Sequence, residues 1–189
     1  MRGNVCLFLV LAVFLLLTGC AGHPQSYVHE NLGLGYVKKI AILPFENNTQ
    51  TKFAEERLRD VVATEILSRN LFSLVEKGDT QRFLREEIVS NQPQMLNLKD
   101  AQKLGKDLQA QAYLAGSVDD YSEVRNGPYS YYVVAATLRL VDTKTGEILW
   151  QVTDSESGYN TWDRVFGLAS DDANQLSFIL VKRMLGTLR

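Results

Sequence analysis

The chain has 189 residues, a length typical of one domain, and its 20 Lys and Arg against 22 Asp and Glu give a formal net charge of −2. Basic residues do not gather into a cluster along it, which excludes the electrostatic footprint of a nucleic-acid-binding protein. The two cysteines, Cys6 and Cys20, both lie in the first twenty residues. Disulfides, thiol catalysis and cysteine metal sites are therefore excluded from the remainder of the chain.

The N-terminal segment has the layout of a secretory signal peptide. Arg2 precedes an apolar run of 13 residues, Val5–Leu17, and small residues follow that run. The run is too short for a membrane-spanning helix, which needs roughly 20 residues. The four residues Leu17-Thr18-Gly19-Cys20 resemble the lipobox of bacterial lipoproteins. This resemblance implies removal of residues 1–19 and lipid attachment at Cys20; the alternative is an ordinary signal peptide with an incidental cysteine.

Residues 20–36 are predicted to form a flexible tether, lipidated at its first residue, because glycine and polar residues show no sustained period there. The tether contains both histidines, His23 and His29, which we interpret as solvated linker residues rather than metal ligands. Residues 37–189, the single expected domain, thus contain no histidine. This excludes His-containing catalytic triads and histidine metal sites from the domain, and we expect neither a metal nor a cofactor.

The periodicity of the domain changes from helical to strand-like along the chain. A buried strand over 37–45 is ended by Pro44, which has no N–H for pairing. Apolar stripes and short apolar runs then predict a helix over 51–70, a strand over 71–76, and helices over 80–89, capped by Asp79, and 99–108. Alternation predicts strands over 112–121, 129–142 and 147–155, with a hairpin turn at 142–146. An irregular stretch over 156–169 precedes a last helix capped by Ser170. The order β-α-β-α-α-β-β-β-α predicts an α/β (α+β) domain, a mixed sheet flanked by helices.

Two adjacent acidic pairs are the remaining candidates for catalysis. Asp119 and Asp120 fall on a predicted strand, where neighbours point to opposite faces, so their carboxylates are not expected to converge. Asp171 and Asp172 stand at the start of the last predicted helix, where they complement the helix dipole. We therefore expect a protein that is not an enzyme. A cell-wall hydrolase is the alternative, and it would require a convergent polar cleft.

Aromatic residues concentrate in the last third of the chain: Tyr121, Tyr129, Tyr131, Tyr132, Trp150, Tyr159 and Trp162. Tyrosine and tryptophan are enriched at interfaces because they combine apolar area with a polar handle. The rings are interpreted either as packing of a strand-rich core or as a partner surface. In the second case Tyr129, Tyr159 and Trp162, at the tips, are the expected contact residues.

Several motifs occur in an order and spacing similar to those of the curli-secretion (CsgG-like) lipoprotein family. They are residues 39–47 (KIAILPFEN), 74–76 (LVE), 83–86 (FLRE), 114–118 (LAGSV), 138–142 (LRLVD) and 145–149 (TGEIL). A similar domain occurs in the lipoprotein that activates a peptidoglycan synthase (LpoB-like). The resemblance covers most of residues 37–188.

This resemblance implies a lipid-anchored periplasmic envelope protein that acts as an assembly or regulatory binding module. Ala21, rather than Asp, follows the cysteine, which by analogy with lipoprotein sorting implies the outer membrane, with the domain facing the periplasm. The expected partners are the membrane, through the lipid anchor, and envelope proteins; formation of a homo-oligomer is left open. The alternative is a subunit of a small outer-membrane secretion channel, in which segments within 119–136 and 151–170 would become membrane strands of about 9–11 residues.

Overall fold

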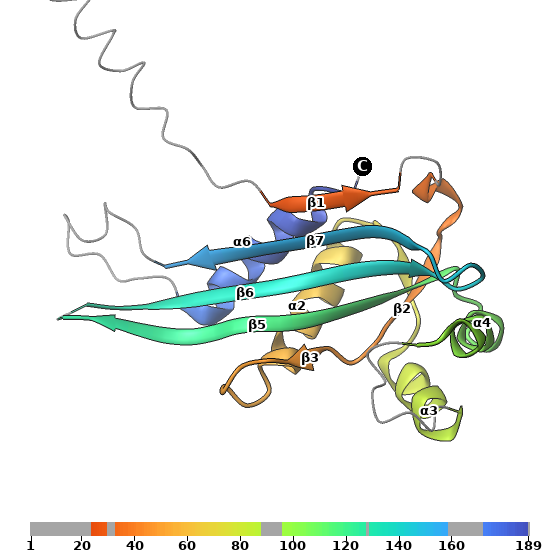
Figure 1. The fold of residues 1–189 in the computed structure, drawn as a ribbon, viewed down its shortest axis with the longest axis horizontal. Helices are drawn as coiled ribbons and strands as arrows, with labels where there is room; N and C mark the ends of the chain where they lie inside the picture. The colour runs from red at the N-terminus through yellow and green to blue at the C-terminus, as the bar shows by residue number, and fades with distance from the viewer. Residues whose placement is uncertain (1–23, 30–32, 88–95, 128, 159–171, 189) are drawn as a thin grey trace, which may run out of the picture.

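The computed structural model describes residues 24–29, 33–87, 96–127, 129–158 and 172–188. These described residues form a seven-stranded mixed sheet with helices on both of its faces, which confirms the predicted fold class (Figure 1). The strands are β1 (Gln25–Val28), β2 (Lys39–Ile42), β3 (Glu46–Asn47), β4 (Ser73–Leu74), β5 (Ala112–Asn126), β6 (Tyr129–Asp142) and β7 (Ile148–Ser157). The helices are α2 (Ala54–Ser68), α3 (Lys77–Glu87), α4 (Leu98–Asp107) and α6 (Ala173–Leu185), with a short 3-10 turn η1 (Leu34–Tyr36).

The strand order in the sheet is β1-β7-β6-β5-β2-β4, with β3 beside β5. Strand β2 runs parallel to both β4 and β5, whereas β6 is antiparallel to β5 and β7. The alternation over 129–142 predicted the bounds of β6 correctly. None of the described helices is long and apolar enough to cross a membrane.

Strand β2 separates two hydrophobic clusters, as expected for a strand buried on both faces. Ile40 and Ile42 pack in the larger cluster, together with residues of α2 and α6. Ala41 and Leu43 pack in the smaller one, together with residues of α3 and α4. All four side chains are buried, so the continuous apolar run of the sequence is explained by two cores that share one strand.

Two of the clustered aromatic residues belong to the larger core. Trp150 is fully buried, and its indole N–H donates to Thr187 Oγ1 at 2.9 Å. Tyr121 is 5 % exposed and lies in the same cluster, against which Tyr132 packs partly buried. The core interpretation is therefore confirmed for these residues.

The structure differs from the sequence-based expectation at residues 25–28, where a flexible tether was predicted. This segment forms β1, an edge strand paired antiparallel with β7 from Gln25 opposite Thr153 to Val28 opposite Trp150. The side chains of Gln25, Ser26 and Tyr27 are exposed, so no apolar pattern marks the strand. Backbone pairing with a preformed neighbour, rather than burial, decides its structure.

A second contact holds the segment that follows β1. The Tyr36 hydroxyl donates to Asp142 Oδ2 at 2.5 Å, across 106 residues of sequence. Asp142 Oδ1 accepts the backbone N–H groups of Lys144 at 2.7 Å and Thr145 at 2.8 Å, which fixes the β6–β7 turn. Burial opposes ionisation of Asp142, but the Tyr36 hydroxyl and the two N–H groups outweigh it, so the pKa of Asp142 is lower than usual. Burial, and then Asp142, raise the pKa of Tyr36.

Two helix starts differ from their predicted positions. The helix α3 begins at Lys77, so Asp79 lies within its first turn instead of capping it. The N-cap of α6 is Asp172, whose side chain accepts the N–H of Gln175 at 2.8 Å. The predicted cap, Ser170, lies outside the described residues. Both carboxylates remain at the positive end of a helix dipole, where they are stabilising.

Gly105 allows α4 to approach the β6–β7 turn closely. A Cβ atom there would lie 2.5 Å from Oγ1 and 2.7 Å from Cβ of Thr143, a buried residue whose hydroxyl donates to Ala110 O at 2.9 Å.

Although alanine is intrinsically the better helix former by about 1 kcal/mol, we expect Gly105→Ala to lower the free energy of unfolding by about 1–3 kcal/mol through overpacking. The matched control is Gly78→Ala, since nothing lies within 4 Å of its Cβ position. We expect this variant to be neutral or more stable in urea unfolding. Equal effects of the two substitutions would contradict this packing argument.

The lowered pKa of Asp142 predicts a pH-dependent contribution to stability. Because the folded pKa is lower than the unfolded one, the contribution is complete above the unfolded pKa and is lost as the pH falls through the folded pKa. We expect Asp142→Asn to lower the free energy of unfolding by about 1–2 kcal/mol at pH 7, and the difference from the wild type to shrink at pH 3. The exposed Asp107→Asn serves as control, with an expected effect within about 0.5 kcal/mol at both pH values. A difference that stays constant between pH 7 and pH 3 would contradict the assigned role of Asp142.

Candidate functional site

The sequence-predicted site residues mostly lie beyond what the structure describes. Cys20, Tyr159 and Trp162 are outside the described residues. Tyr129 begins β6, opposite Asn126, at the end of the β5–β6 hairpin, and its side chain is not among those described. Lipid attachment and the aromatic contact surface therefore remain predictions.

One hollow lies on a face of the sheet, over β5 and its two neighbours β3 and β6. It is lined by Glu46, Asn48, Ala115, Gly116, Ser117, Asp119, Thr137 and Arg139. Asp119 accepts hydrogen bonds from Ser117 Oγ at 2.8 Å, Thr137 Oγ1 at 2.9 Å and Asn48 Nδ2 at 3.1 Å. Its carboxylate is thus engaged with the protein itself.

The expectation that Asp119 and Asp120 point to opposite faces is wrong. The pairing register of β5 shifts between Val118 and Asp120, which marks a β-bulge. Val118 and Tyr121 both pack in the larger core, three positions apart, so the two aspartates between them lie on the other side of the sheet. The bulge breaks the strict alternation on which the expectation rested. The three donors to Asp119 identify it as a residue that stabilises the bulge.

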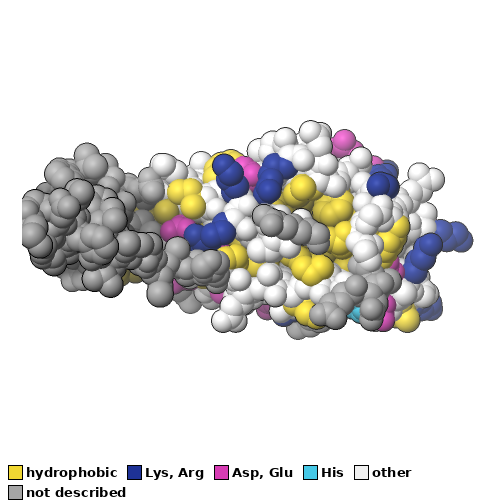
Figure 2. All heavy atoms as spheres, turned by 90° about the horizontal axis from the view of Figure 1, so that it is seen from above, with side chains coloured by type: hydrophobic (Ala, Val, Ile, Leu, Met, Phe, Trp, Pro, Cys, Tyr) yellow, Lys and Arg dark blue, Asp and Glu magenta, His cyan; other side chains and the backbone are white. Residues whose placement is uncertain are grey.

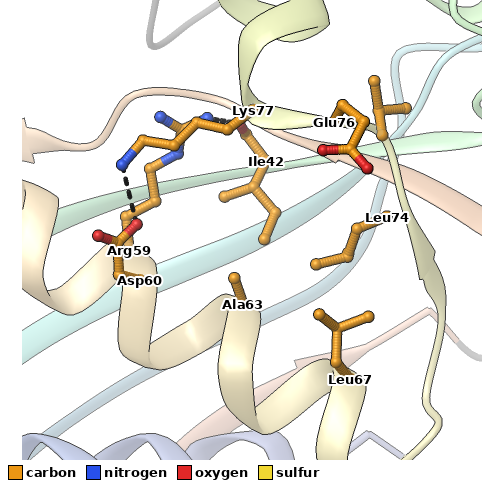
Figure 3. Close-up of a pocket in the computed structure, with 9 residues that line it drawn as sticks. Ile42, Arg59, Asp60, Ala63, Leu67, Leu74, Glu76 and Lys77 are labelled. Carbon is orange, nitrogen blue, oxygen red and sulfur yellow. Dashed lines mark hydrogen bonds and ion pairs between the residues drawn. The ribbon is translucent and has the colours of Figure 1, made fainter.

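A second hollow lies between α2, the carboxyl ends of β2 and β4, and the start of α3 (Figure 3). Its volume is about 220 Å³, and its lining residues are Ile42, Arg59, Asp60, Ala63, Leu67, Leu74, Val75, Glu76 and Lys77. Figure 3 shows Ile42, Ala63, Leu67 and Leu74 around one common space, with Arg59 and Lys77 beside it. We call this hollow the Arg59 pocket.

Arg59 is the functional candidate that sequence reasoning missed. The prediction of a helix over 51–70 rested on its apolar stripe and did not single out Arg59, yet the residue is only 5 % exposed. Its Nη2 donates to the backbone oxygen of Ile42 at 2.5 Å, at the end of β2. Burial lowers the pKa of Arg59, and the nearby charges of Asp60 and Glu56 only partly oppose this. The sequence did contain a signal for its burial. Arg59 lies three positions before Val62, which lies four positions before Ile66, so the three residues share one face of the helix.

The face drawn in Figure 2 does not indicate a polyanion-binding surface. On the face seen in Figure 2, hydrophobic side chains lie among polar and basic ones, and neither sign of charge gathers into a continuous area. In the described part of the chain, no group of three His, Cys, Asp or Glu residues is placed to hold a metal ion.

The comparison with protein families matches most of the described sheet. The family described as peptidoglycan-synthase activator LpoB matches residues 25–155, which is more than half of the chain. The chain therefore belongs to the LpoB family of peptidoglycan-synthase activators. No curated protein matches the chain.

Solved structures share the fold at low sequence identity. The PelC dodecamer from Paraburkholderia phytofirmans is 16 % identical, with a TM-score of 0.61 over 89 % of this chain and 97 % of that one. Lipoprotein GNA1162 from Neisseria meningitidis is 21 % identical, with a TM-score of 0.50 over 69 % of this chain and 91 % of that one. Neither these structures nor the family match supports the curli-secretion part of the resemblance or the channel alternative.

Proposed function

We propose that this chain is a non-enzymatic, lipid-anchored envelope protein that regulates a peptidoglycan synthase by binding it. The observation that carries the proposal is the family match, which begins at the first residue of β1 and ends within β7. It therefore spans every strand of the described sheet. Regulation by binding, rather than by catalysis, is supported by the description of the family as activators.

The anchor in this proposal is Cys20, in the outer membrane, with the domain facing the periplasm. Two or more acyl chains on one cysteine would hold the protein stably, whereas a single chain binds only marginally. Because β1 starts at Gln25, four residues, 21–24, separate it in sequence from the anchored cysteine. An extended chain spans roughly 3.5 Å per residue, so β1 would stay within about 17 Å of the anchored cysteine. The domain would thus work close to the membrane surface, and the synthase would have to reach it there.

The proposed contact surface comprises Tyr129, Tyr159 and Trp162. Tyr129 begins β6 at the end of the β5–β6 hairpin, which Figure 1 shows opposite the end where α3 and α4 lie. Aromatic side chains at such tips supply contact area at low conformational cost. Self-association is also part of the proposal, since the similar PelC structure is a dodecamer.

The test compares the full chain with a variant in which Tyr129, Tyr159 and Trp162 are all changed to alanine. We expect the wild type to bind a peptidoglycan synthase from the same cell and the triple variant to bind at least tenfold more weakly, since aromatic anchors dominate interface energies. The matched control is Tyr27→Ala, which removes a 52 % exposed tyrosine from β1 and should leave the affinity unchanged.

The outcomes separate the two parts of the proposal. Failure of the wild type to bind any synthase of that cell would contradict the function. Binding that the triple substitution leaves intact would contradict only the contact surface.

A further inference from the structure

We propose that the Arg59 pocket binds the C-terminal residue of a peptide chain, with Arg59 receiving the terminal carboxylate and the hollow receiving an apolar side chain. The proposal concerns a site separate from the hairpin end and does not depend on binding of a synthase.

Arg59 has no directly paired carboxylate among the described residues, although the charges of Asp60 and Glu56 act on it from nearby. A guanidinium group carries five N–H donors, and in the described structure its single hydrogen-bond partner is the Ile42 carbonyl. No carboxylate of the described residues lies within ion-pair distance of it, although the residue is 5 % exposed. A buried charge is costly unless it is paired. A ligand carboxylate would supply the missing partner, and arginine binds carboxylates in a bidentate geometry that lysine does not reproduce.

The two cations of the pocket, Arg59 and Lys77, differ in whether a carboxylate is paired with them. Lys77 Nζ lies 2.9 Å from Asp60 and 3.7 Å from Glu56, so its charge is already compensated (Figure 3). Arg59 is thus the cation of the pocket that can respond to an incoming anion. Asp60 and Glu76 also line the pocket, and both are exposed, so water screens their repulsion of an incoming anion.

The volume of the pocket and the apolar side chains that line the rest of it limit what it can hold. Ile42, Ala63, Leu67 and Leu74 provide an apolar surface, and Leu67 is 54 % exposed beside it. The volume of about 220 Å³ is below the range of about 300–1,000 Å³ that is typical of cofactor and drug-sized ligands. It suits one residue that carries both a carboxylate and an aliphatic side chain. A chain terminus has both on the same residue, which is why we assign the pocket to a C-terminus.

The position in the fold agrees with this assignment. Ile42 ends β2, Leu74 ends the parallel strand β4, and Lys77 begins α3. In open sheets, ligands bind outside the carboxyl ends of parallel strands. The backbone N–H groups at the start of α3 add positive partial charge at the same place.

The probe for this site is N-acetyl-leucine, which mimics a C-terminal leucine, and its neutral isostere N-acetyl-leucine amide. We expect N-acetyl-leucine to shift the NMR signals of Ile42, Ala63, Leu67 and Leu74 saturably, with a dissociation constant of about millimolar for so small a ligand. The amide should bind at least tenfold more weakly, because it lacks the charge that pairs with Arg59. Free leucine should bind no more tightly than N-acetyl-leucine.

Two variants test the role of the side chains. Arg59→Gln should weaken binding of N-acetyl-leucine at least tenfold, while Arg57→Gln, on the exposed face of α2, should not change it. Because Arg59→Gln also removes a buried contact, Leu67→Glu provides a second variant at an exposed position. It places a resident carboxylate at the pocket and should abolish binding, whereas Ile179→Glu, at an exposed position of α6, should not.

Three results would overturn the proposal. The first is equal binding of N-acetyl-leucine and N-acetyl-leucine amide. The second is a set of shifted NMR signals from residues that lie away from the Arg59 pocket. The third is tighter binding of free leucine than of N-acetyl-leucine, which would assign the pocket to a free amino acid. Synthase binding plays no part in this measurement, so either proposal can fail without the other.

Discussion

The pairing of β6 with both of its neighbours is the constraint on which the described structure depends. β6 is paired with β5 from Tyr129 to Asp142, and with β7 from Val133 to Val141. Leu138 and Leu140 on one face of β6 pack in the larger core, whereas Val141 packs in the smaller one. This one strand therefore positions both cores, and its last residue, Asp142, holds the turn and the Tyr36 side chain.

The same sheet explains how the N-terminal segment is fixed. β7 offers an open edge to β1, and His29 N–H continues the pairing to Leu149 O at 3.0 Å. The hydroxyl of Tyr36 then holds the end of the segment at Asp142. An edge strand with exposed side chains gains its stability from backbone hydrogen bonds and from this one distant contact. In the proposed function, this docking limits the distance between the domain and the lipid anchor far more than the length of residues 20–36 would.

Most of the fold could be predicted from the sequence because its strongest signals are also its strongest interactions. The continuous apolar run before Pro44 predicted a strand buried on both faces, and the alternation over 129–142 predicted β6, since burial produces both patterns. β1 could not be predicted, because its side chains are exposed and only a backbone edge specifies it. The bulge at Asp119 was missed because strict alternation was assumed along the strand, whereas the inserted residue shifts the pattern so that Val118 and Tyr121, three positions apart, face the same core.

The candidate site was predicted less well than the fold. Tyr121 and Trp150 belong to the core, Tyr159 and Trp162 lie outside the described residues, and the side chain of Tyr129 is not described, so aromatic clustering alone did not locate a surface. Arg59 was overlooked because a charged residue beside an apolar stripe is ordinarily solvated, and its burial depends on the packing of α2 against β2 and β4. Such a residue becomes evident only once tertiary structure shows what surrounds it.

In the proposed function, a domain held close to the membrane regulates a peptidoglycan synthase. The decisive measurement is the rate at which a synthase from the same cell polymerises its lipid-linked substrate, with and without the full-length protein. We expect a several-fold higher rate with the protein, and no polymerisation by the protein alone. A rate that stays unchanged at saturating protein, for every synthase of the cell, would contradict the proposed function.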